Sequence, residues 1–319
     1  MAAIEVLKPG LLSNFQDLGR EGFQHLGVPV SGVMDELSHR LANWAVGNPP
    51  GTATLEITLQ GPVLRFNVAC TLAWCGADLS PTLDGQPLER ATATRVPAGS
   101  ELRFGKRRSG ARAYLALRGG FALDEIMGSC STNLRGAFGG QQGRALRQGD
   151  GLAVHNPLYL KRSPRMDLSS AAAAALDALL AADHSPLRTL PGPDWLHFTP
   201  AAQAAWVEAE WTMSPRSDRM GYCLQGPLLE RQAAQDLLSC AVAFGSVQVP
   251  PDGQPIVLMA DRPTTGGYPR IAELATVERC RLAQALPGAT LRFTMITLEQ
   301  SQALLRERER LLALLTEKA

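Results

Sequence analysis

The chain has 319 residues, enough for one large domain or two domains of ordinary size. Lys and Arg number 31 against 30 Asp and Glu, so a formal net charge of +1 argues against a dedicated nucleic-acid binder or a protein of anionic membrane surfaces. Apolar residues make up 45% of the chain, and 30 Gly and 22 Pro are spread along it, which excludes collagen-like and wholly disordered classes. The composition therefore indicates a soluble globular protein.

The N-terminal segment gives an expectation for location. It carries Glu5, Lys8 and Asp17 and lacks a basic stretch followed by an apolar core, so no signal peptide is predicted. The longest apolar stretch, 171–182, is too short to span a bilayer. We expect a cytoplasmic protein whose six cysteines are reduced, and their spacing predicts no metal site.

The first predicted helix begins near Asp35, whose carboxylate is placed to cap it, and ends at Gly47. Its apolar face is formed by Met34, Leu37, Leu41 and Trp44. Most of the remaining chain mixes β-branched and aromatic residues in short runs, as is typical of strands. These predicted strands cover 55–66, 71–74, 111–117, 256–259 and 289–297. Asp-Gly pairs at 84–85 and 252–253 predict tight hairpin turns.

Two strings recur in the same order. LQGPVL at 59–64 returns as LQGPLL at 224–229, and DGQP at 84–87 returns at 252–255. The similar offsets suggest an internal duplication, although coincidence between common turn strings is the alternative. We place two related barrel lobes at 1–166 and 191–297, an Ala-rich helix or linker at 167–190, and an amphipathic C-terminal helix at 298–319.

Familiar catalytic motifs are missing from the sequence. It contains no Walker A motif, no dinucleotide-binding fingerprint, no HExxH and no GxSxG. The five histidines are scattered, so their spacing assembles neither a hydrolytic triad nor a zinc site.

The densest group of polar residues among glycines and prolines is the segment 248–270, QVPPDGQPIVLMADRPTTGGYPR. A predicted strand delivers Asp261 at its end, and a loop with Thr264, Thr265, Gly266 and Gly267 follows. Consecutive backbone amides beside two hydroxyls can bind an oxyanion or a phosphate. The alternative is a structural loop in which the threonine hydroxyls satisfy the local backbone.

Other polar turns have no assigned chemistry. Asp17 and Arg20, in QDLGR, could form an ion pair or grip a planar carboxylate or amide. Ser217 and Arg219 lie in SPRSDRMGY, and the string GSCST covers 128–132.

Seven ordered strings together resemble one family, known as the biotin-dependent carboxyltransferase, KipA-like, allophanate hydrolase subunit 2 or 5-oxoprolinase C-subunit family. They are QDLGREG at 16–22, SGVMD at 31–35, RLAN at 40–43, LEITLQGP at 55–62, MGSCSTNL at 127–134, SDRMGYCLQGP at 217–227, and QVPPDGQPIVLMAD with PTTGGYPRIA ending at 272. The resemblance implies a mainly β, cyclophilin-like barrel architecture. It also implies two partners, a KipI-like B subunit of 5-oxoprolinase together with a separate A subunit. One departure is Cys240, which stands where the family often has His.

The leading interpretation is one component of a 5-oxoprolinase, which opens the lactam of 5-oxoproline to glutamate at the expense of ATP. The ATP could be bound by this chain or by a partner. Candidate catalytic residues are Thr264, Thr265, Asp261 and Arg219. Candidate substrate-binding residues are Arg20, Asp17, Ser217, Gln248, Gln254, Gly266, Gly267, Tyr268 and Arg270.

Two other interpretations stay open. The first is carboxyl transfer from carboxybiotin to a small amide, with the biotin carried by another protein, because this chain has no biotinyl-lysine string. The second is a non-enzymatic regulator that binds a KipI-like inhibitor of a kinase.

Overall fold

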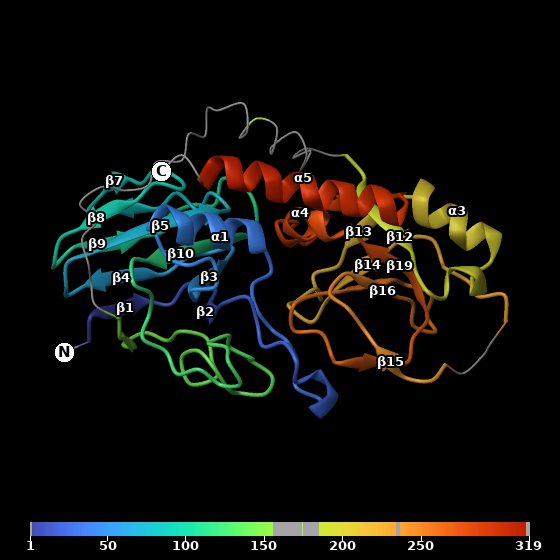
Figure 1. Cartoon of the computed structure of the whole chain (residues 1–319), viewed down its shortest axis with the longest axis horizontal. Coiled ribbons are helices and arrows are strands. Elements are labelled where there is room, and N and C mark those ends of the chain that lie inside the picture. Colours follow the sequence, from blue (N-terminus) through green and yellow to red (C-terminus); the bar gives the residue numbers. More distant parts are fainter. Residues whose placement is uncertain (1, 156–173, 175–184, 234–236, 317–319) are drawn as a thin grey trace. The chain divides into compact units, whose positions relative to one another are not determined.

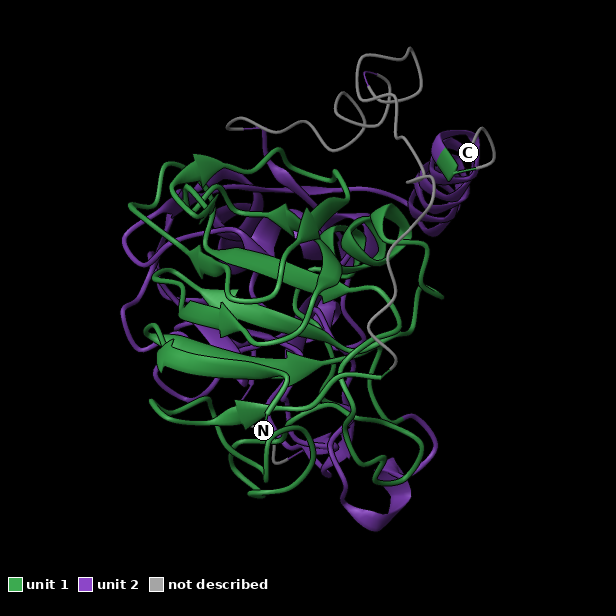
Figure 2. Cartoon of the chain, turned by 90° about the vertical axis from the view of Figure 1, so that its left-hand side faces the viewer, with its two compact units in different colours: residues 1–20, 31–167, 316–319 green, residues 21–30, 168–315 purple. Residues whose placement is uncertain are grey.

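The computed structural model describes residues 2–155, 174, 185–233 and 237–316, with the elements labelled in Figure 1. The chain groups into two compact units, coloured separately in Figure 2. Unit 1 comprises Met1–Arg20, Ser31–Asp167 and Thr316–Ala319. Unit 2 comprises Glu21–Val30 and Leu168–Leu315.

Unit 1 is built from two antiparallel sheets. Its strands are β1 Ile4–Lys8, β2 Leu12–Gln16, β3 Thr54–Thr58, β4 Val63–Phe66, β5 Cys70–Gly76, β6 Thr82–Leu83, β7 Gln86–Pro87, β8 Thr94–Val96, β9 Glu101–Arg103, β10 Arg112–Leu117 and β11 Gly151–Leu152. The strand orders are β11-β1-β4-β9-β6-β7 and β2-β3-β10-β5-β8. Ile4 and Phe66 of the first sheet share one buried core with Leu55 and Leu115 of the second, so the sheets face each other across it.

Helix α1 (Glu36–Ala45) packs on β5 and β10. The carboxylate of Asp35 accepts a hydrogen bond from the Ser38 backbone N–H at 3.0 Å, as expected of an N-cap. Gly47 has a φ of 71° and donates its N–H to the Trp44 carbonyl at 2.8 Å, which ends the helix. The predicted helix and the capping role of Asp35 are confirmed.

Unit 2 is dominated by an eight-stranded sheet of order β20-β13-β14-β17-β16-β19-β12-β21, with a separate β15-β18 ribbon. Its strands are β12 Leu187–Pro191, β13 Trp211–Met213, β14 Gly221–Gln225, β15 Cys240–Ala241, β16 Ser246–Gln248, β17 Ile256–Leu258, β18 Thr265–Gly266, β19 Arg270–Leu274, β20 Thr290–Leu291 and β21 Phe293–Met295. Its α-helices among the described residues are α3 Pro200–Glu208, α4 Arg279–Ala283 and α5 Leu298–Thr316. Trp206 of α3 stacks on Phe293 at 4.2 Å between ring centroids, which fixes α3 against the sheet.

The mainly β fold with a few helices is confirmed, and so is the C-terminal helix, which forms as α5. Strands also form where 71–74, 111–117 and 256–259 predicted them. The single strand predicted over 55–66 is wrong, because Leu59 adopts a φ of 60° and the chain turns between β3 and β4. The predicted strand 289–297 is likewise divided into β20 and β21.

The Ala-rich segment predicted over 167–190 lies outside the described residues up to position 184, apart from Ala174. Its last residues, from Leu187 onward, form strand β12. A linker was expected at these last positions, and β12 instead pairs with β19 and β21.

The repeated strings share one feature and differ in another. A Cβ atom on Gly61 would lie 2.5 Å from the Phe104 side chain, and one on Gly226 would lie 2.6 Å from the Trp211 side chain, so each LQGP glycine lies against an aromatic ring. In the first DGQP, Asp84 and Gly85 both have positive φ and make the predicted tight turn between β6 and β7. The second DGQP lies in the longer connection from β16 to β17. The Gly253 N–H donates to the Pro250 carbonyl at 3.0 Å, so a turn forms there, but not the short two-residue hairpin made at 84–85. The duplication itself stays a hypothesis.

Candidate functional site

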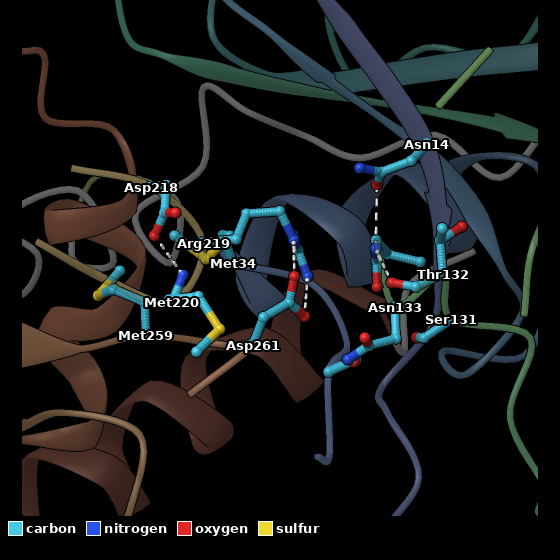
Figure 3. Close-up of polar contacts among 12 residues, drawn as sticks. Asn14, Met34, Ser131, Thr132, Asn133, Asp218, Arg219, Met220, Met259 and Asp261 are labelled. Atoms are coloured by element: carbon cyan, nitrogen blue, oxygen red, sulfur yellow. Dashed lines mark hydrogen bonds and ion pairs between the residues drawn. The ribbon is translucent and has the colours of Figure 1, made fainter. Parts of the chain in front are cut away.

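Two predicted catalytic residues of unit 2, Arg219 and Asp261, bind each other (Figure 3). The guanidinium donates through Nε to Asp261 Oδ2 at 2.8 Å and through Nη2 to Oδ1 at 3.1 Å. Both residues are buried, with 4% and 5% of their surfaces exposed. A bidentate pair of this kind is strong and directional, and it joins the SDRMGY and VLMAD strings.

The backbone around this pair is joined as well. The Asp261 N–H donates to the Arg219 carbonyl at 2.8 Å, and the Met259 N–H donates to the Met220 carbonyl at 3.0 Å. Asp218 accepts from the Met220 N–H at 2.7 Å and so fixes the turn, as Figure 3 shows. The arrangement gives Arg219 and Asp261 a clear structural task, which the sequence did not reveal.

Residues 264–267, TTGG, form part of a small ribbon in which β18 pairs with β15. In this TTGG ribbon, Gly266 lies opposite Cys240 and Thr265 lies opposite Ala241. Within the described residues, neither the Thr264 nor the Thr265 hydroxyl makes a hydrogen bond, and Thr265 is exposed. The hydroxyls therefore do not serve the local backbone, which was the structural alternative. They remain available to a ligand.

The glycines of this ribbon leave room for neighbouring polar groups. A Cβ atom on Gly266 would lie 2.2 Å from Gln248 Nε2, and one on Gly267 would lie 3.3 Å from Ser239 Oγ. Gln248 is buried, and its amide donates to the Tyr268 carbonyl at 3.4 Å. Gln248, Gly266, Gly267 and Tyr268, all predicted to bind substrate, are thus brought together beside Cys240.

Strands β16 and β19 add a further polar group next to the ribbon. Ser246 lies opposite Glu273 and donates to its carboxylate at 2.8 and 3.0 Å. Arg270 lies opposite Gln248 and donates to the Ala241 carbonyl of β15 at 3.2 Å. Burial raises the pKa of Glu273, although Ser246 and nearby arginines favour its charged form. A buried carboxyl group with a perturbed pKa beside several charged groups is a candidate for proton transfer.

Two further cations, Arg262 and Arg279, lie near the Phe244 ring. Arg262 donates through Nε to the Val242 carbonyl at 3.3 Å, and its guanidinium carbon lies 6.0 Å from the Phe244 ring centroid. The guanidinium carbon of Arg279 lies 4.9 Å from the same centroid. Arg262, Glu273 and Arg279 were not predicted from the sequence. They are distant in the chain, and the β16–β19 and β15–β18 pairings are what bring the segments around them together.

Asp17 and Arg20 lie in unit 1, where both support the loop 129–131. Asp17 Oδ1 accepts hydrogen bonds from the Ser129 and Ser131 hydroxyls, each at 2.6 Å, and Oδ2 accepts from the Cys130 N–H at 2.6 Å. Arg20 is 1% exposed, and its guanidinium lies 4.7 Å from the Phe138 ring centroid. Their contacts show a role in holding this loop, and they lie in a different unit from the TTGG ribbon.

Two predicted substrate-binding residues have local partners. The Ser217 hydroxyl accepts from the Cys223 N–H at 3.1 Å. The Gln254 amide pairs with both backbone groups of Gly226, accepting at 2.9 Å and donating at 3.1 Å. Both side chains stabilise turns next to β14.

A second buried polar network in unit 1 was not predicted. Glu56, 1% exposed, accepts hydrogen bonds from the Met34 N–H at 2.9 Å and from the Tyr114 hydroxyl at 2.8 Å. The Tyr114 hydroxyl oxygen accepts in turn from the Asp35 N–H at 2.8 Å. The network thus holds the end of the SGVMD string, which precedes α1, onto strands β3 and β10. A charged residue inside a predicted strand was the available signal.

Comparison with known proteins identifies the family. The family described as carboxyltransferase domain, subdomain A and B, matches residues 26–295. The chain belongs to this family. It is 37% identical over 306 residues to the C subunit of 5-oxoprolinase from Haemophilus influenzae, covering 96% of this chain and 95% of that protein. It is 36% identical over 307 residues to the C subunit of 5-oxoprolinase from Escherichia coli, covering 96% of each.

A solved structure extends the family relation to the fold. The crystal structure of the K. lactis urea amidolyase matches with a TM-score of 0.86 and 28% identity, covering 97% of this chain and 20% of that one. The chain therefore spans about a fifth of the length of that protein. The resemblance and the barrel-like, mainly β architecture inferred from the sequence are confirmed.

Two properties of the described part of the chain bear on its possible ligands. No helix there combines the length and hydrophobicity needed to cross a bilayer. The same residues contain no cluster of three or more His, Cys, Asp and Glu side chains placed to hold a metal ion.

Proposed function

We propose that this chain is the C subunit of a 5-oxoprolinase, which works with a KipI-like B subunit, together with an A subunit, to open 5-oxoproline to glutamate at the expense of ATP. The observation that carries this proposal is identity of 37% and 36%, over nearly the full length of both partners in each comparison, to two proteins named as the C subunit of 5-oxoprolinase. The word subunit in those names supports the expectation of further chains.

The chemistry explains why ATP is needed. Amide resonance makes the lactam carbonyl a poor electrophile. ATP supplies a phosphoryl group that converts the lactam oxygen into part of a leaving group. Water then adds to the former carbonyl carbon, and the C–N bond of the ring breaks to leave an acyl phosphate. A second water displaces phosphate from it, so that glutamate, ADP and phosphate are the products.

The ribbon of unit 2 fits a part in this reaction. The hydroxyls of Thr264 and Thr265 make no hydrogen bond within the described residues and can donate to phosphate or to a developing oxyanion. Glu273, which is largely buried and accepts from the Ser246 hydroxyl, is the candidate acid for the ring nitrogen as the C–N bond breaks. Gln248 can orient an amide group, because its side chain is buried beside Gly266.

The test is ATP hydrolysis that depends on 5-oxoproline, measured with this chain alone and with the co-expressed A and B subunits. We expect activity in the complete mixture. Thr265→Val should lower its turnover at least tenfold with assembly intact, because one charge-assisted hydrogen bond is worth roughly 1.5–3 kcal/mol. Thr212→Val changes an exposed strand threonine of the same unit and should leave turnover unchanged. No activity in a mixture that demonstrably assembles contradicts the proposal.

Membership of a carboxyltransferase family favours a second candidate, carboxyl transfer from carboxybiotin on another protein to a small amide. An assembled but inactive 5-oxoprolinase mixture that transfers carboxyl groups from free carboxybiotin to urea or another amide would support it. If neither activity is found and the chain still binds a KipI-like protein, a regulatory role remains.

A further inference from the structure

Arg262 is a cation without a carboxylate partner among the described residues. Its side-chain hydrogen bonds go to two backbone carbonyls, those of Val242 at 3.3 Å and Met259 at 3.5 Å. The acidic side chains whose charge reaches it are Glu21 and Asp261, and neither forms an ion pair with it within the part of the chain described. Asp261 is instead bonded to Arg219. Backbone carbonyls orient the guanidinium but do not neutralise it.

A second guanidinium shares the same aromatic ring. Arg262 and Arg279 both lie against Phe244, at 6.0 and 4.9 Å from the ring centroid. Their like charges repel each other. Burial and the charge of Arg279 together lower the pKa of Arg262 to about 10. The charge of Glu273 also reaches Arg279. Arg262 is therefore the cation at which an anion would best relieve this repulsion.

The surroundings limit which anion fits. Arg262 is only partly buried, so a small ligand can reach it. Val242, whose carbonyl accepts from Arg262, donates its N–H to the Thr264 carbonyl at 3.3 Å and so connects Arg262 to the TTGG ribbon. The Ser246 hydroxyl donates to the Glu273 carboxylate. The acid group at Glu273 faces Arg270, Arg279 and Asp194, so the region combines cations, an acid and exposed hydroxyls. A planar carboxylate matches the two-pronged donor geometry of a guanidinium.

We propose that Arg262, with Arg279 at the same Phe244 ring, binds the carboxylate group of a small anionic ligand. The assignment of that carboxylate to 5-oxoproline rests on the proposed function, whereas the site itself does not. In that setting the carboxylate is anchored beside the ribbon, and the lactam ring is left to reach the threonine hydroxyls. Arg262 is not among the arginines predicted from the sequence to serve the site, which are Arg20, Arg219 and Arg270.

Calorimetric titration tests the site directly, with the chain alone and with the assembled subunits. The probes are 5-oxoproline, its neutral carboxamide and 2-pyrrolidinone, which lacks the carboxylate. We expect 5-oxoproline to bind more tightly than both neutral probes. Arg262→Gln should lower the affinity for 5-oxoproline about tenfold to a hundredfold, which is the effect of losing a charge-assisted hydrogen bond.

Two variants separate binding from folding. Arg262→Lys keeps the positive charge but loses the paired N–H donors of the guanidinium. Its affinity for 5-oxoproline should therefore lie between those of the wild type and Arg262→Gln. Arg292→Gln removes an exposed arginine paired with Glu210 and should bind 5-oxoproline normally. Thermal unfolding of each variant verifies that the fold is retained.

The outcomes distinguish the two proposals. Equal affinity of wild type and a folded Arg262→Gln variant, or no 5-oxoproline binding by wild type in either setting, overturns the carboxylate site. If Arg262→Gln hydrolyses ATP with an unchanged KM for 5-oxoproline, the proposed function is supported and the proposed carboxylate site is wrong. If hydrolysis is absent but carboxylate binding depends on Arg262, the site stands and the function falls.

Discussion

The Arg219–Asp261 pair allows a sharp test of whether two predicted catalytic residues are structural. Removing one partner of a buried ion pair leaves the other charge without compensation, at a cost of about 3–5 kcal/mol. Arg219→Gln and Asp261→Asn should each lower the free energy of unfolding by roughly this amount, since both side chains are nearly inaccessible and joined by two hydrogen bonds. The double variant leaves no buried charge unpaired and should cost clearly less than the sum.

Urea unfolding followed by circular dichroism measures these three variants and the wild type. Arg292→Gln serves as the control, because its partner Glu210 is exposed and such pairs contribute about 0–1 kcal/mol. Additive single-variant effects would refute the reasoning. So would an Arg219→Gln variant of normal stability whose KM for 5-oxoproline rises, since Arg219 would then serve the substrate and not the fold.

Two further predictions concern pH and the family departure. Burial lowers the pKa of His39 from an ordinary 6.5 to about 4. Between these two pH values the His39 side chain is protonated in the unfolded chain but neutral in the folded chain. Stability is therefore lost as pH falls, by about 2 kcal/mol between pH 7 and 5, and His39→Gln should lack this share of the loss in urea titrations at both pH values. Cys240→His should raise turnover of the assembled enzyme if an imidazole opposite Gly266 takes part in the reaction; equal turnover would mark position 240 as a packing position.

The elements that the sequence predicted well are those determined by near neighbours in the chain. The helix after Asp35 could be predicted because a cap and a terminating glycine fall within one short stretch. The predicted apolar face was only partly right, since Leu41 and Trp44 are half-buried while Ala42 and Asn43 are buried. The Asp84-Gly85 turn could be read for the same reason, since both residues adopt positive φ.

The features that escaped prediction depend on contacts between distant segments. Arg219 and Asp261 are 42 positions apart and meet only because β14 pairs with β17. The pKa of Glu273 is raised by burial and is also influenced by Ser246 of the neighbouring strand β16 and by Arg279, which lies outside β19. The TTGG segment was singled out correctly as polar, but its pairing with Cys240 follows from strand register, which no local pattern encodes.

The grouping of the chain into two units has a consequence for dissecting the protein. Among the described residues, the polypeptide changes unit at 20–21, 30–31 and 315–316, and residues 185–315 group with 21–30. A cut in the Ala-rich segment would therefore not yield two self-contained fragments, because 21–30 would remain with the first fragment although it groups with the second. Truncation is consequently a poor way to assign activities to either half. Point substitutions within the intact chain are the appropriate tool.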